Sequence, residues 1–425
     1  MSAYELRPPM AQAEPLERDH GNAVWVGSAD FVVANSGEDI VLQDGGAYSK
    51  ARLLIWDFDR VRGFVEVPVR DSTVSSEELC RAVVSLPVPD PAASQVPVAP
   101  TSVVVCTRDR AHDLRLCLEA LLQLDFATFE VIVVDNAPSD TSTLQLVREL
   151  ADPHIRYMVE NKRGLARARN AGVRSARYDY IAFTDDDVVV DRRWLTALHR
   201  GFSLGADVDC VTGMVATGQL QSRSQRYFDR RVSWARNVNR TIFRLQDPPP
   251  DMPLFPFQFG AYGTGANFSA RRSALFELGG FDEALGVGSP TAGGEDIDFF
   301  IRVVLANRAL VYLPDAVVWH KHRADDEGLK VQLENYGRGL GAVLTKLACE
   351  RRARRLMATR LVRGIRHARQ MVRVETATRN RTLSGLGGVE LRGILRGPYA
   401  LHRARRSGLV RPLKDDVNPS SAASA

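Results

Sequence analysis

The chain has 425 residues, of which 45% are hydrophobic and 25% are charged. This length and composition leave room for two or three globular domains with a large core. No run of 18 apolar residues occurs, and the first ten residues lack the basic-then-apolar order of a signal peptide. We therefore expect neither a transmembrane helix nor a leader. Five scattered cysteines without zinc-site spacing indicate free thiols in a reducing cytoplasm.

The net charge of +5 is distributed unevenly along the chain. Residues 351–412 hold 17 Arg against two acidic residues and carry +15, whereas residues 413–425 carry −1. Residues 1–350 therefore carry −9. Because the positive charge belongs to one segment, the overall charge does not indicate a nucleic-acid-binding domain, and no nucleic-acid partner is expected.

A small β-rich N-terminal domain is predicted for residues 1–86. Two apolar runs, Leu53–Trp56 and Phe64–Val69, flank a polar turn and indicate a hairpin, and Ser76–Val84 has the pattern of a short helix. This part contains no catalytic constellation, so we interpret it as a docking or packing module. The five prolines between residues 87 and 100 predict a semi-rigid linker.

From residue 101 onward, buried strands alternate with amphipathic helices. Strands are predicted at Val103–Cys106, Val131–Val134, Arg156–Val159 and Tyr180–Thr184, and helices at Leu114–Leu121, Leu144–Leu150 and Leu165–Ala176. This alternation is typical of a parallel α/β sheet, in which ligands bind at the carboxyl ends of the strands. Several polar side chains would lie at that edge: Thr107, Arg108, Asp109, Asp135, Asn136, Asp185, Asp186 and Asp187.

Three consecutive aspartates, Asp185–Asp187, follow the last of these strands. Their charges repel one another, and we expect no basic residue of the segment to neutralise them. A divalent cation would neutralise them, and carboxylate ligands suit Mg²⁺ or Mn²⁺, whose shell is often completed by substrate phosphates. The alternative is a solvated acidic turn that caps the helix beginning near Arg192.

Basic residues gather where the helix near residue 165 begins. The segment Asn161–Asn170 contains Arg163, Arg167 and Arg169. A helix N-terminus with nearby arginines attracts phosphate, so these three residues are candidates for binding a diphosphate. The alternative is that they form a solvated face of the helix.

The order of these motifs resembles the family 2 glycosyltransferases of the GT-A fold. The segments are VVVCTRDR, VIVVDNA, NKRGLARARNAG and FTDDD, followed by GTGANFSARR, GGFDE, GGEDIDF and VWHKH. The resemblance covers residues 101–345 and implies a GT-A-type nucleotide-binding parallel or mixed sheet flanked by helices. It also implies an inverting, hexosyltransferase-type enzyme that moves a sugar from a nucleotide diphosphate sugar to an acceptor hydroxyl.

The resemblance implies roles for individual residues. Asp296 would be the catalytic base, and Glu295 would hold the acceptor or orient the loop. The metal ligands would be Asp187, Asp185 and His320. Donor contacts would come from Thr107, Arg108, Asp135, Arg163, Arg167, Arg169, Asp185 and Asp186. Acceptor contacts would come from Gly265, Asn267 and Glu295.

Two of these assignments have structural alternatives. Glu295 and Asp296 could instead interact favourably with the positive end of the helix that follows them. His320 and His322 alternate after a predicted strand at Ala316–Trp319, which places both imidazoles on one face. Either histidine could be a packing residue, and we interpret His322 in that way.

Two further segments concern the acceptor and the partners. Residues 218–260 are rich in Arg and aromatic residues, and their rings either stack on acceptor sugars or cover the core. Residues 346–412 are predicted to form a basic amphipathic helical region with an apolar stripe from Met357 to Val372, and residues 413–425 a disordered C-terminus. The helical region binds an anionic membrane surface or packs on the catalytic domain. Membrane binding would place the protein in the cytoplasm, peripheral on the inner face of the cytoplasmic membrane, with a glycan or lipid-linked acceptor.

The expected activity belongs to cell-envelope glycan, glycolipid or natural-product glycosylation. One alternative is a nucleotidyltransferase, which typically has a glycine-rich loop after the first strand, whereas Thr107–His112 contains no glycine. Another is a non-catalytic sugar-nucleotide-binding protein, which would not need to keep Asp185–Asp187, Asp296 and His320 together.

Overall fold

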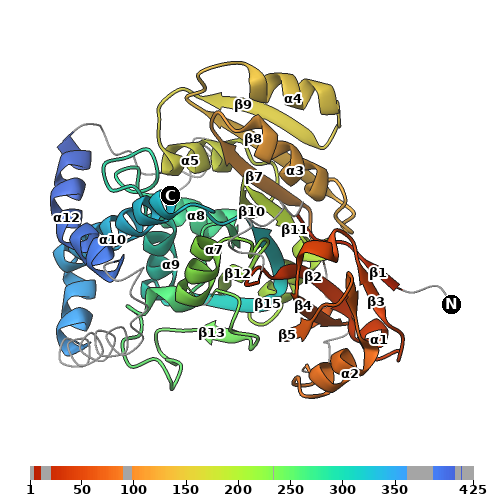
Figure 1. Cartoon of the computed structure of the whole chain (residues 1–425). Helices are drawn as coiled ribbons and strands as arrows, with labels where there is room; N and C mark the ends of the chain where they lie inside the picture. Colours follow the sequence, from red (N-terminus) through yellow and green to blue (C-terminus); the bar gives the residue numbers. More distant parts are fainter. Residues whose placement is uncertain are drawn as a thin grey trace.

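A nine-stranded mixed sheet forms the centre of the molecule (Figure 1). The computed structural model describes residues 4–10, 21–89, 98–232, 234–360, 386–406 and 413. The strand order is β11-β15-β12-β14-β10-β7-β8-β9, and β13 pairs with β15. The strands are β7 (Thr101–Thr107), β8 (Phe129–Asn136), β9 (Ile155–Glu160), β10 (Tyr180–Asp185), β11 (Val188–Val190), β12 (Val208–Thr217), β13 (Thr241–Phe243), β14 (Asn267–Arg271) and β15 (Ala309–His320).

The predicted alternation of strands and helices is confirmed, but the sheet is only partly parallel. Strand β7 pairs in parallel with β8 and with β10, and β8 pairs in parallel with β9. Strands β12 and β15 also pair in parallel. Strand β14 lies antiparallel between β10 and β12, and β11 and β13 run antiparallel to β15. Strands β7, β8, β9, β10, β12 and β15 therefore all run in one direction, and their carboxyl ends meet at one edge of the sheet.

Helices cover both faces of the sheet because alternate strand residues point to opposite sides. On β7, Val104 enters the core under one helical layer, whereas Val103 and Val105 enter the core under the other. The first layer contains α5 (Leu165–Ser175), α8 (Arg272–Glu277), α9 (Glu295–Leu305) and α10 (Asp326–Cys349). The second contains α3 (Ala111–Leu121), α4 (Ser142–Leu150) and α6 (Trp194–Phe202).

The aromatic residues of segment 218–260 mainly cover the core. Phe228 on α7 (Arg223–Val232) is fully buried, and Phe243 and Phe255 are part of the core under the first helical layer. A short 3₁₀ helix, η3 (Phe259–Ala261), ends this segment. Of the two interpretations of these rings, the structure supports core packing for the three buried phenylalanines.

The described residues of the N-terminal part form two small sheets, two α-helices and one short 3₁₀ helix, at the lower right of Figure 1. The predicted hairpin is confirmed, and the Ser76–Val84 helix is confirmed as α2. The elements are β1 (Tyr4–Leu6), β2 (Trp25–Asp30), α1 (Phe31–Ala34), β3 (Ile40–Leu42), η2 (Gly45–Ala47), β4 (Lys50–Asp57), β5 (Arg60–Pro68), β6 (Thr73–Val74) and α2 (Ser76–Val84).

The N-terminal part and the central sheet share a hydrophobic core, which we call the shared core. Val26, Leu54, Trp56 and Val61 pack in one cluster with Met214 and Ala216 on β12 and with Val317 and Trp319 on β15. Polar contacts reinforce the junction. Asp315, which is 4% exposed, accepts hydrogen bonds from the Val61 amide at 2.9 Å and from Arg60 Nη1 at 2.8 Å.

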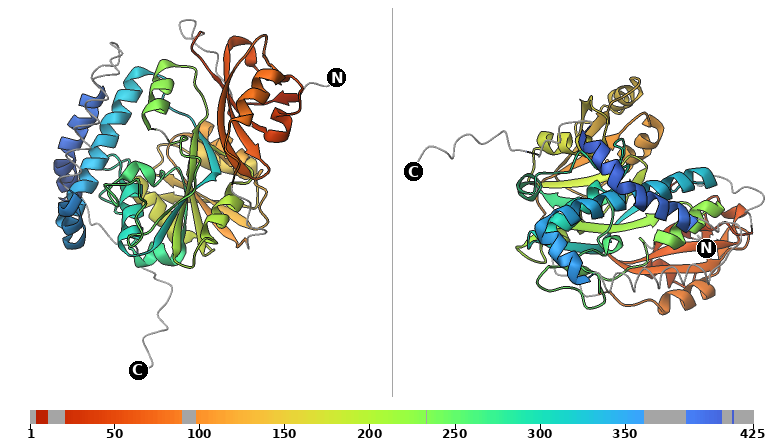
Figure 2. Two further views of the ribbon diagram at one scale, coloured as in Figure 1. Left: turned by 90° about the horizontal axis from the view of Figure 1, so that it is seen from below. Right: turned by 90° about the vertical axis from the view of Figure 1, so that its left-hand side faces the viewer.

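Helices α10 and α12 (Leu386–Arg406) lie side by side (Figure 2). Glycines make this close approach possible. A Cβ atom on Gly337 or Gly341 of α10 would overlap the carbonyl oxygen of Glu390 or Ile394, and one on Gly393 of α12 would overlap that of Glu334. No helix in the described ranges is long and apolar enough to cross a membrane.

The predictions for the linker and the tail concern residues that lie partly outside the described ones. Residues 90–97 of the expected linker lie outside them, as do 361–385, which hold most of the expected Met357–Val372 stripe. Residues 351–360 are helical. Leu413 was expected in the disordered C-terminus, but it is buried and its amide donates to the Gly279 carbonyl at 3.0 Å.

Candidate active site

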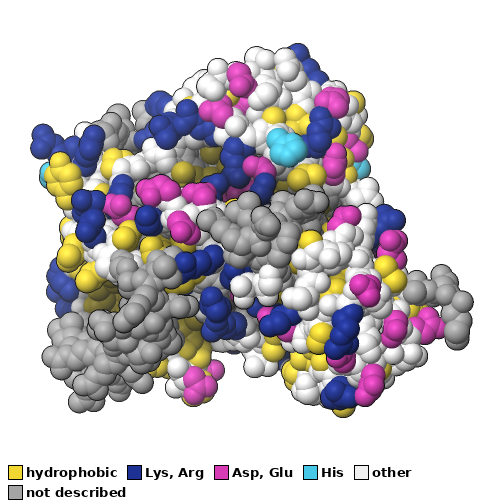
Figure 3. Space-filling model, in the orientation of Figure 1, with side chains coloured by type: hydrophobic (Ala, Val, Ile, Leu, Met, Phe, Trp, Pro, Cys, Tyr) yellow, Lys and Arg dark blue, Asp and Glu magenta, His cyan; other side chains and the backbone are white. Residues whose placement is uncertain are grey.

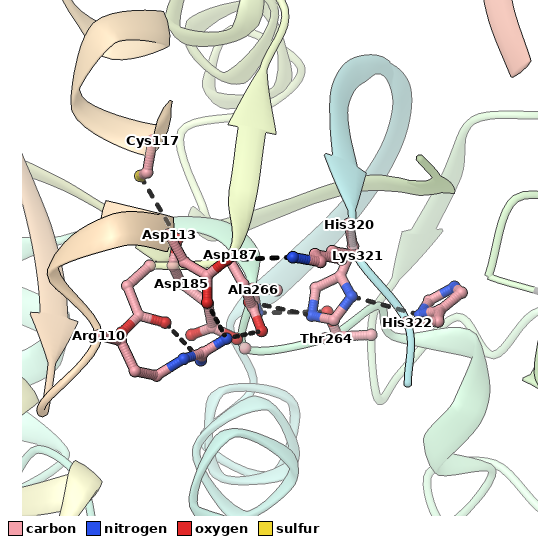
Figure 4. Close-up of polar contacts among 12 residues, drawn as sticks. Arg110, Asp113, Cys117, Asp185, Asp187, Thr264, Ala266, His320, Lys321 and His322 are labelled. Atoms are coloured by element: carbon pink, nitrogen blue, oxygen red, sulfur yellow. Dashed lines mark hydrogen bonds and ion pairs between the residues drawn. The ribbon is translucent and has the colours of Figure 1, made fainter. Parts of the chain in front are cut away.

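The carboxyl edge of the sheet brings the predicted polar residues together. Thr107, Asp135 and Asp185 lie at the ends of β7, β8 and β10, and His320 ends β15. His320 comes from a strand more than a hundred residues later in the chain, but it reaches the same edge because β15 runs parallel to β12. Figure 4 shows Asp185, Asp187 and His320 pointing toward one another.

The three consecutive aspartates have different partners. Asp185 accepts a hydrogen bond from Arg169 Nη2 at 3.2 Å. Asp186 accepts from Thr107 Oγ1 and Arg110 Nη1, both at 2.7 Å. Asp187 Oδ2 accepts from Arg110 Nη2 at 2.9 Å, and its Oδ1 lies 3.4 Å from His320 Nε2. The middle carboxylate therefore pairs with Thr107 and Arg110, whereas the other two group with His320.

The electrostatic environments of these carboxylates differ as well. Burial raises the pKa of Asp186 to about 7, against the opposing effect of Arg110. Burial also acts to raise the pKa of Asp187, but His320 and Arg110 outweigh it and hold the pKa below its usual value. Asp187 is therefore the better anion of the two, as a metal ligand must be.

Asp185, Asp187 and His320 have a donor set that suits a divalent cation. One ligand atom from each residue lies within 4.8 Å of the others. Two carboxylates and one imidazole are ligands that Mn²⁺ accepts readily, and Mg²⁺ also takes the carboxylates. These are the three residues predicted as metal ligands, and the structure brings them together.

Arg110 is a site residue that the sequence analysis missed. It contacts both Asp186 and Asp187. It also pairs with Asp113 at 3.1 Å, as Figure 4 shows. The sequence analysis considered only basic residues of the same segment, whereas Arg110 comes from the loop after β7, 75 residues or more earlier in the chain. The position of Arg110 could have indicated this role, because it lies three residues beyond the end of a strand, at the edge of the sheet where ligands were predicted to bind.

Arg169 does not have the free guanidinium expected of a diphosphate ligand. It is 3% exposed, and it donates to Glu295 Oε1 at 2.8 Å, to Asp185 Oδ1 at 3.2 Å and to the Gly265 carbonyl at 2.9 Å. All three acceptors are protein groups. Arg169 therefore holds Asp185 and the start of α9 close together.

The other predicted donor-site residues lie around this edge. Arg163 is exposed, next to the glycine that precedes α5, and Arg167 pairs with Glu283 at 3.3 Å. Arg108 donates to the Ala137 carbonyl at 3.2 Å. Asp135 is fully buried and accepts from the Tyr157 hydroxyl at 2.9 Å, and burial raises its pKa.

Glu295 and Asp296 begin α9 but have different environments. Glu295 is 5% exposed and ion-paired to Arg169, and burial, followed by the charge of Asp296, raises its pKa to about 7. This position fits the loop-orienting role rather than acceptor contact. Asp296 is partly exposed, and its Oδ2 accepts from the Gly265 amide at 2.7 Å while Oδ1 accepts from the Ile297 amide at 2.8 Å.

Asn267 was expected to contact the acceptor, and the structure contradicts this. Its side chain is fully buried. The amide nitrogen donates to the carbonyls of Met214 and Ala316, and Oδ1 accepts from Trp194 Nε1 at 2.8 Å. Asn267 therefore ties β14 to β12, β15 and α6, and every polar atom of its side chain is used within the core.

A mixed sheet flanked by helices, with an acidic and imidazole cluster at its carboxyl edge, has the GT-A fold of glycosyltransferases. Comparison with known proteins agrees with this class. Residues 102–275 match the model of Glycosyl transferase family 2, and they are a family 2 glycosyltransferase domain.

Several known proteins are similar to the chain. A pre-mycofactocin glycosyltransferase of Mycobacterium tuberculosis is 30% identical over 266 residues, which cover 60% of this chain and 49% of that protein. The succinoglycan biosynthesis protein ExoO of Rhizobium meliloti is 26% identical over 322 residues, which cover 73% and 85%. The chain thus spans about half the length of the mycobacterial relative.

Among solved structures, a mannosyltransferase from Pyrobaculum calidifontis, in complex with GDP-Man and Mn²⁺, is 17% identical with a TM-score of 0.48. The match covers 72% of this chain and 90% of that one.

Proposed function

We propose that the protein is a metal-dependent inverting glycosyltransferase of the hexosyltransferase type that uses a nucleotide diphosphate sugar as donor. The observation that carries this proposal is the grouping of Asp185, Asp187 and His320 at the sheet edge, joined through Arg169 to the segment that bears Asp296. The acceptor would be a hydroxyl of a glycan, glycolipid or natural product.

The proposed donor site lies along the carboxyl edge of the sheet. Thr107, Arg108 and Asp135 would contact the nucleotide, and the exposed Arg163 and the neighbouring Arg167 would reach the diphosphate. Asp185, Asp187 and His320 would hold Mn²⁺ or Mg²⁺, which when bound would offset the negative charge that develops on the leaving group. Asp186 supports this site indirectly by fixing Arg110 and Thr107.

Asp296 is the proposed general base. Each of its carboxylate oxygens accepts one backbone N–H, and each oxygen keeps lone-pair capacity for the proton of an acceptor hydroxyl. The two backbone contacts fix the direction of the carboxylate. Attack of the hydroxyl from the face opposite the leaving diphosphate would invert the anomeric centre.

The test compares two variants across a panel of UDP-, GDP- and dTDP-sugars with Mn²⁺ or Mg²⁺. Asp296→Asn should still bind the donor in a thermal-shift assay, but nucleoside diphosphate release should fall roughly 10²–10⁴-fold. Asp187→Asn should lose metal-dependent donor binding. Glu277→Gln, on the surface of α8 and paired with Arg308, is the control and should match the wild type.

The same assay separates the alternatives. Near-wild-type release by Asp296→Asn would overturn its role as base, and release that persists in EDTA would overturn the metal requirement. A nucleotidyltransferase would instead release pyrophosphate from a nucleoside triphosphate, and a non-catalytic binding protein would shift in melting temperature without releasing product.

We also propose that α12 brings the enzyme to an anionic membrane surface, with a lipid-linked acceptor. Leu391, Leu395 and Tyr399 are four residues apart along α12, and they are 56%, 73% and 70% exposed. Arg392 and Arg396 are exposed beside them. Figure 3 shows this mixture of yellow and dark blue side chains at the left edge, where α12 lies in Figure 1. An apolar stripe flanked by arginines suits the inner face of the cytoplasmic membrane.

Flotation with liposomes tests this surface. The protein should float with phosphatidylglycerol vesicles and not with phosphatidylcholine vesicles, and Leu395→Glu should abolish most of the flotation. Val84→Glu changes a similarly exposed residue, 69% exposed, on the N-terminal α2 and should leave flotation intact. Absence of wild-type flotation, or equal loss in both variants, would contradict the proposal.

A further inference from the structure

A chain of hydrogen bonds links His320 to the N-terminal part of the molecule. His320 Nδ1 lies 3.3 Å from His322 Nδ1, a contact drawn in Figure 4. His322 Nε2 lies 3.0 Å from Thr217 Oγ1 at the end of β12, and Thr217 Oγ1 donates to Asp229 Oδ1 on α7 at 2.7 Å. Asp229 Oδ2 accepts from Arg52 Nη1 on β4 at 2.8 Å. We call this series the Arg52–His320 relay.

The direction of each hydrogen bond follows from the Arg52 end. An arginine only donates and an ionised carboxylate only accepts, so Asp229 accepts from both of its neighbours. The single hydroxyl hydrogen of Thr217 points to Asp229. The Thr217 oxygen must therefore accept from His322, which requires a hydrogen on His322 Nε2.

The relay then determines which nitrogen of His320 carries its hydrogen. His322 is 3% exposed, and its ring contacts Phe228 at 4.7 Å between centroids, so a second proton on it would bring the cost of a buried charge. With its only hydrogen on Nε2, His322 offers Nδ1 as an acceptor. His320 Nδ1 must supply the hydrogen for that contact, so Nε2, which lies 3.4 Å from Asp187, is the nitrogen that remains to face the metal position.

We propose that the Arg52–His320 relay fixes the tautomer and ring orientation of His320, so that its Nε2 faces the metal position, and that the N-terminal part thereby supports the metal site. The proposal rests on the proposed function in that it takes His320 as a metal ligand. Arg52, Asp229, Thr217 and His322 are positioning residues in this scheme. They touch neither substrate nor metal, and they act through His320.

One member of the relay comes from the N-terminal part, which would give that part a role beyond packing. Arg52 comes from β4, Asp229 from α7, Thr217 from β12 and His320 from β15. Arg52 is itself held by Glu66 on β5, whose Oε1 accepts from its Nε at 2.9 Å and from its Nη2 at 2.6 Å. One guanidinium thus connects the N-terminal hairpin to the end of the relay.

Two measurements on the full chain test the relay. Long-range ¹⁵N–¹H NMR of the histidine rings, recorded without metal, reports the tautomer of His320, and Mn²⁺ titration followed by electron paramagnetic resonance reports metal affinity. Wild-type His320 should have its hydrogen on Nδ1. Thr217→Val keeps the shape of the side chain but removes its acceptor, so the tautomer signal should become mixed and Mn²⁺ affinity should fall roughly 10- to 100-fold.

Matched variants distinguish the relay from general damage. Thr217→Ser should restore both readouts, and Arg52→Gln should weaken Mn²⁺ binding without changing residues in the catalytic domain. Glu66→Gln alters the other partner of Arg52 and should leave the His320 tautomer unchanged.

The outcomes also separate the relay from the metal site. A wild-type His320 without a hydrogen on Nδ1, or unchanged tautomer and Mn²⁺ affinity in Thr217→Val, would overturn the proposal. A wild type that shows the expected tautomer and its loss in Thr217→Val, but does not bind Mn²⁺, would support the relay and count against the metal site.

Discussion

At the scale of residues, one buried guanidinium connects the two halves of the proposed site. Arg169 contacts Asp185 on the metal side and both Glu295 and the Gly265 carbonyl on the side of the proposed base. Gly265 in turn donates its amide to Asp296. The distance between the metal carboxylates and Asp296 is therefore set by side chains that are buried and fully paired, which favours a preorganised site.

Site residues were predictable from the sequence where their location depended on the end of a predicted strand. Asp185, Asp187 and His320 follow strand ends, and parallel strands in one direction must bring those ends to one edge. The choice of ion-pair partners was not predictable, because it depends on tertiary distances that the local pattern does not contain. Arg110 and Arg169 look alike in sequence, but only the structure shows that they neutralise different carboxylates. The prediction that Asn267 contacts the acceptor was wrong for the same reason, because its partners lie in other elements of the core.

A buried histidine outside the site should make stability depend on pH. His199 is 4% exposed and lies 2.7 Å from Thr101 Oγ1, and burial lowers its pKa from 6.5 to about 4. Between those values the unfolded chain binds a proton and the folded chain does not, so stability falls as the pH falls. From pH 7 to pH 5 this residue should account for about 2 kcal/mol of lost unfolding free energy.

Urea denaturation at both pH values checks this expectation. Between pH 7 and pH 5, the unfolding free energy of His199→Gln should fall by about 2 kcal/mol less than that of the wild type. The control is His402→Gln, at an exposed position on α12, which should keep the wild-type pH dependence. Parallel pH profiles for the wild type and His199→Gln would refute the assignment.

At the scale of elements, local pattern was a good guide wherever an element had one buried face. The helix at Ser76–Val84 and the strands that follow residue 100 were found within a few residues of their observed bounds. The antiparallel insertion of β14 between β10 and β12 was not foreseen. A short buried strand has the same apolar pattern in either direction, and its direction depends on how far the chain travels before it returns to the sheet.

The contact of α10 with α12 depends on glycine, and one added methyl group should disturb it. In Gly341→Ala, the new Cβ would overlap the Ile394 carbonyl oxygen. The two helix backbones must then move apart, which should lower the unfolding free energy by about 1–3 kcal/mol. Urea denaturation measures this loss, and limited proteolysis should cut near α12 sooner than in the wild type.

Gly388→Ala is the matched control for this prediction. Gly388 also lies in α12, but a Cβ there would meet nothing within 4 Å. Because alanine favours helix more than glycine, this variant should gain about 0.5–1 kcal/mol. Equal destabilisation by both substitutions would show that the close approach of the two helices is not what Gly341 provides.

At the scale of the whole molecule, the charge division predicted from the sequence has a spatial counterpart. Acidic residues of the body include the carboxylates gathered at the sheet edge, whereas α12 presents exposed arginines on its outer side. Its inner side is used for packing on α10. The packing interpretation of the basic tail therefore holds for the inner side of α12, whereas membrane binding by the outer side stays a proposal.

Sequence boundaries and physical boundaries do not coincide in this chain. The proline-rich segment suggests a place to cut, but a fragment that began after residue 100 would leave Met214, Val317 and Trp319 facing water. An apolar edge of that kind invites aggregation. For protein engineering, the N-terminal part and the domain built on the central sheet are therefore one transferable unit. A chimera that exchanged either would need a partner with a matching apolar face.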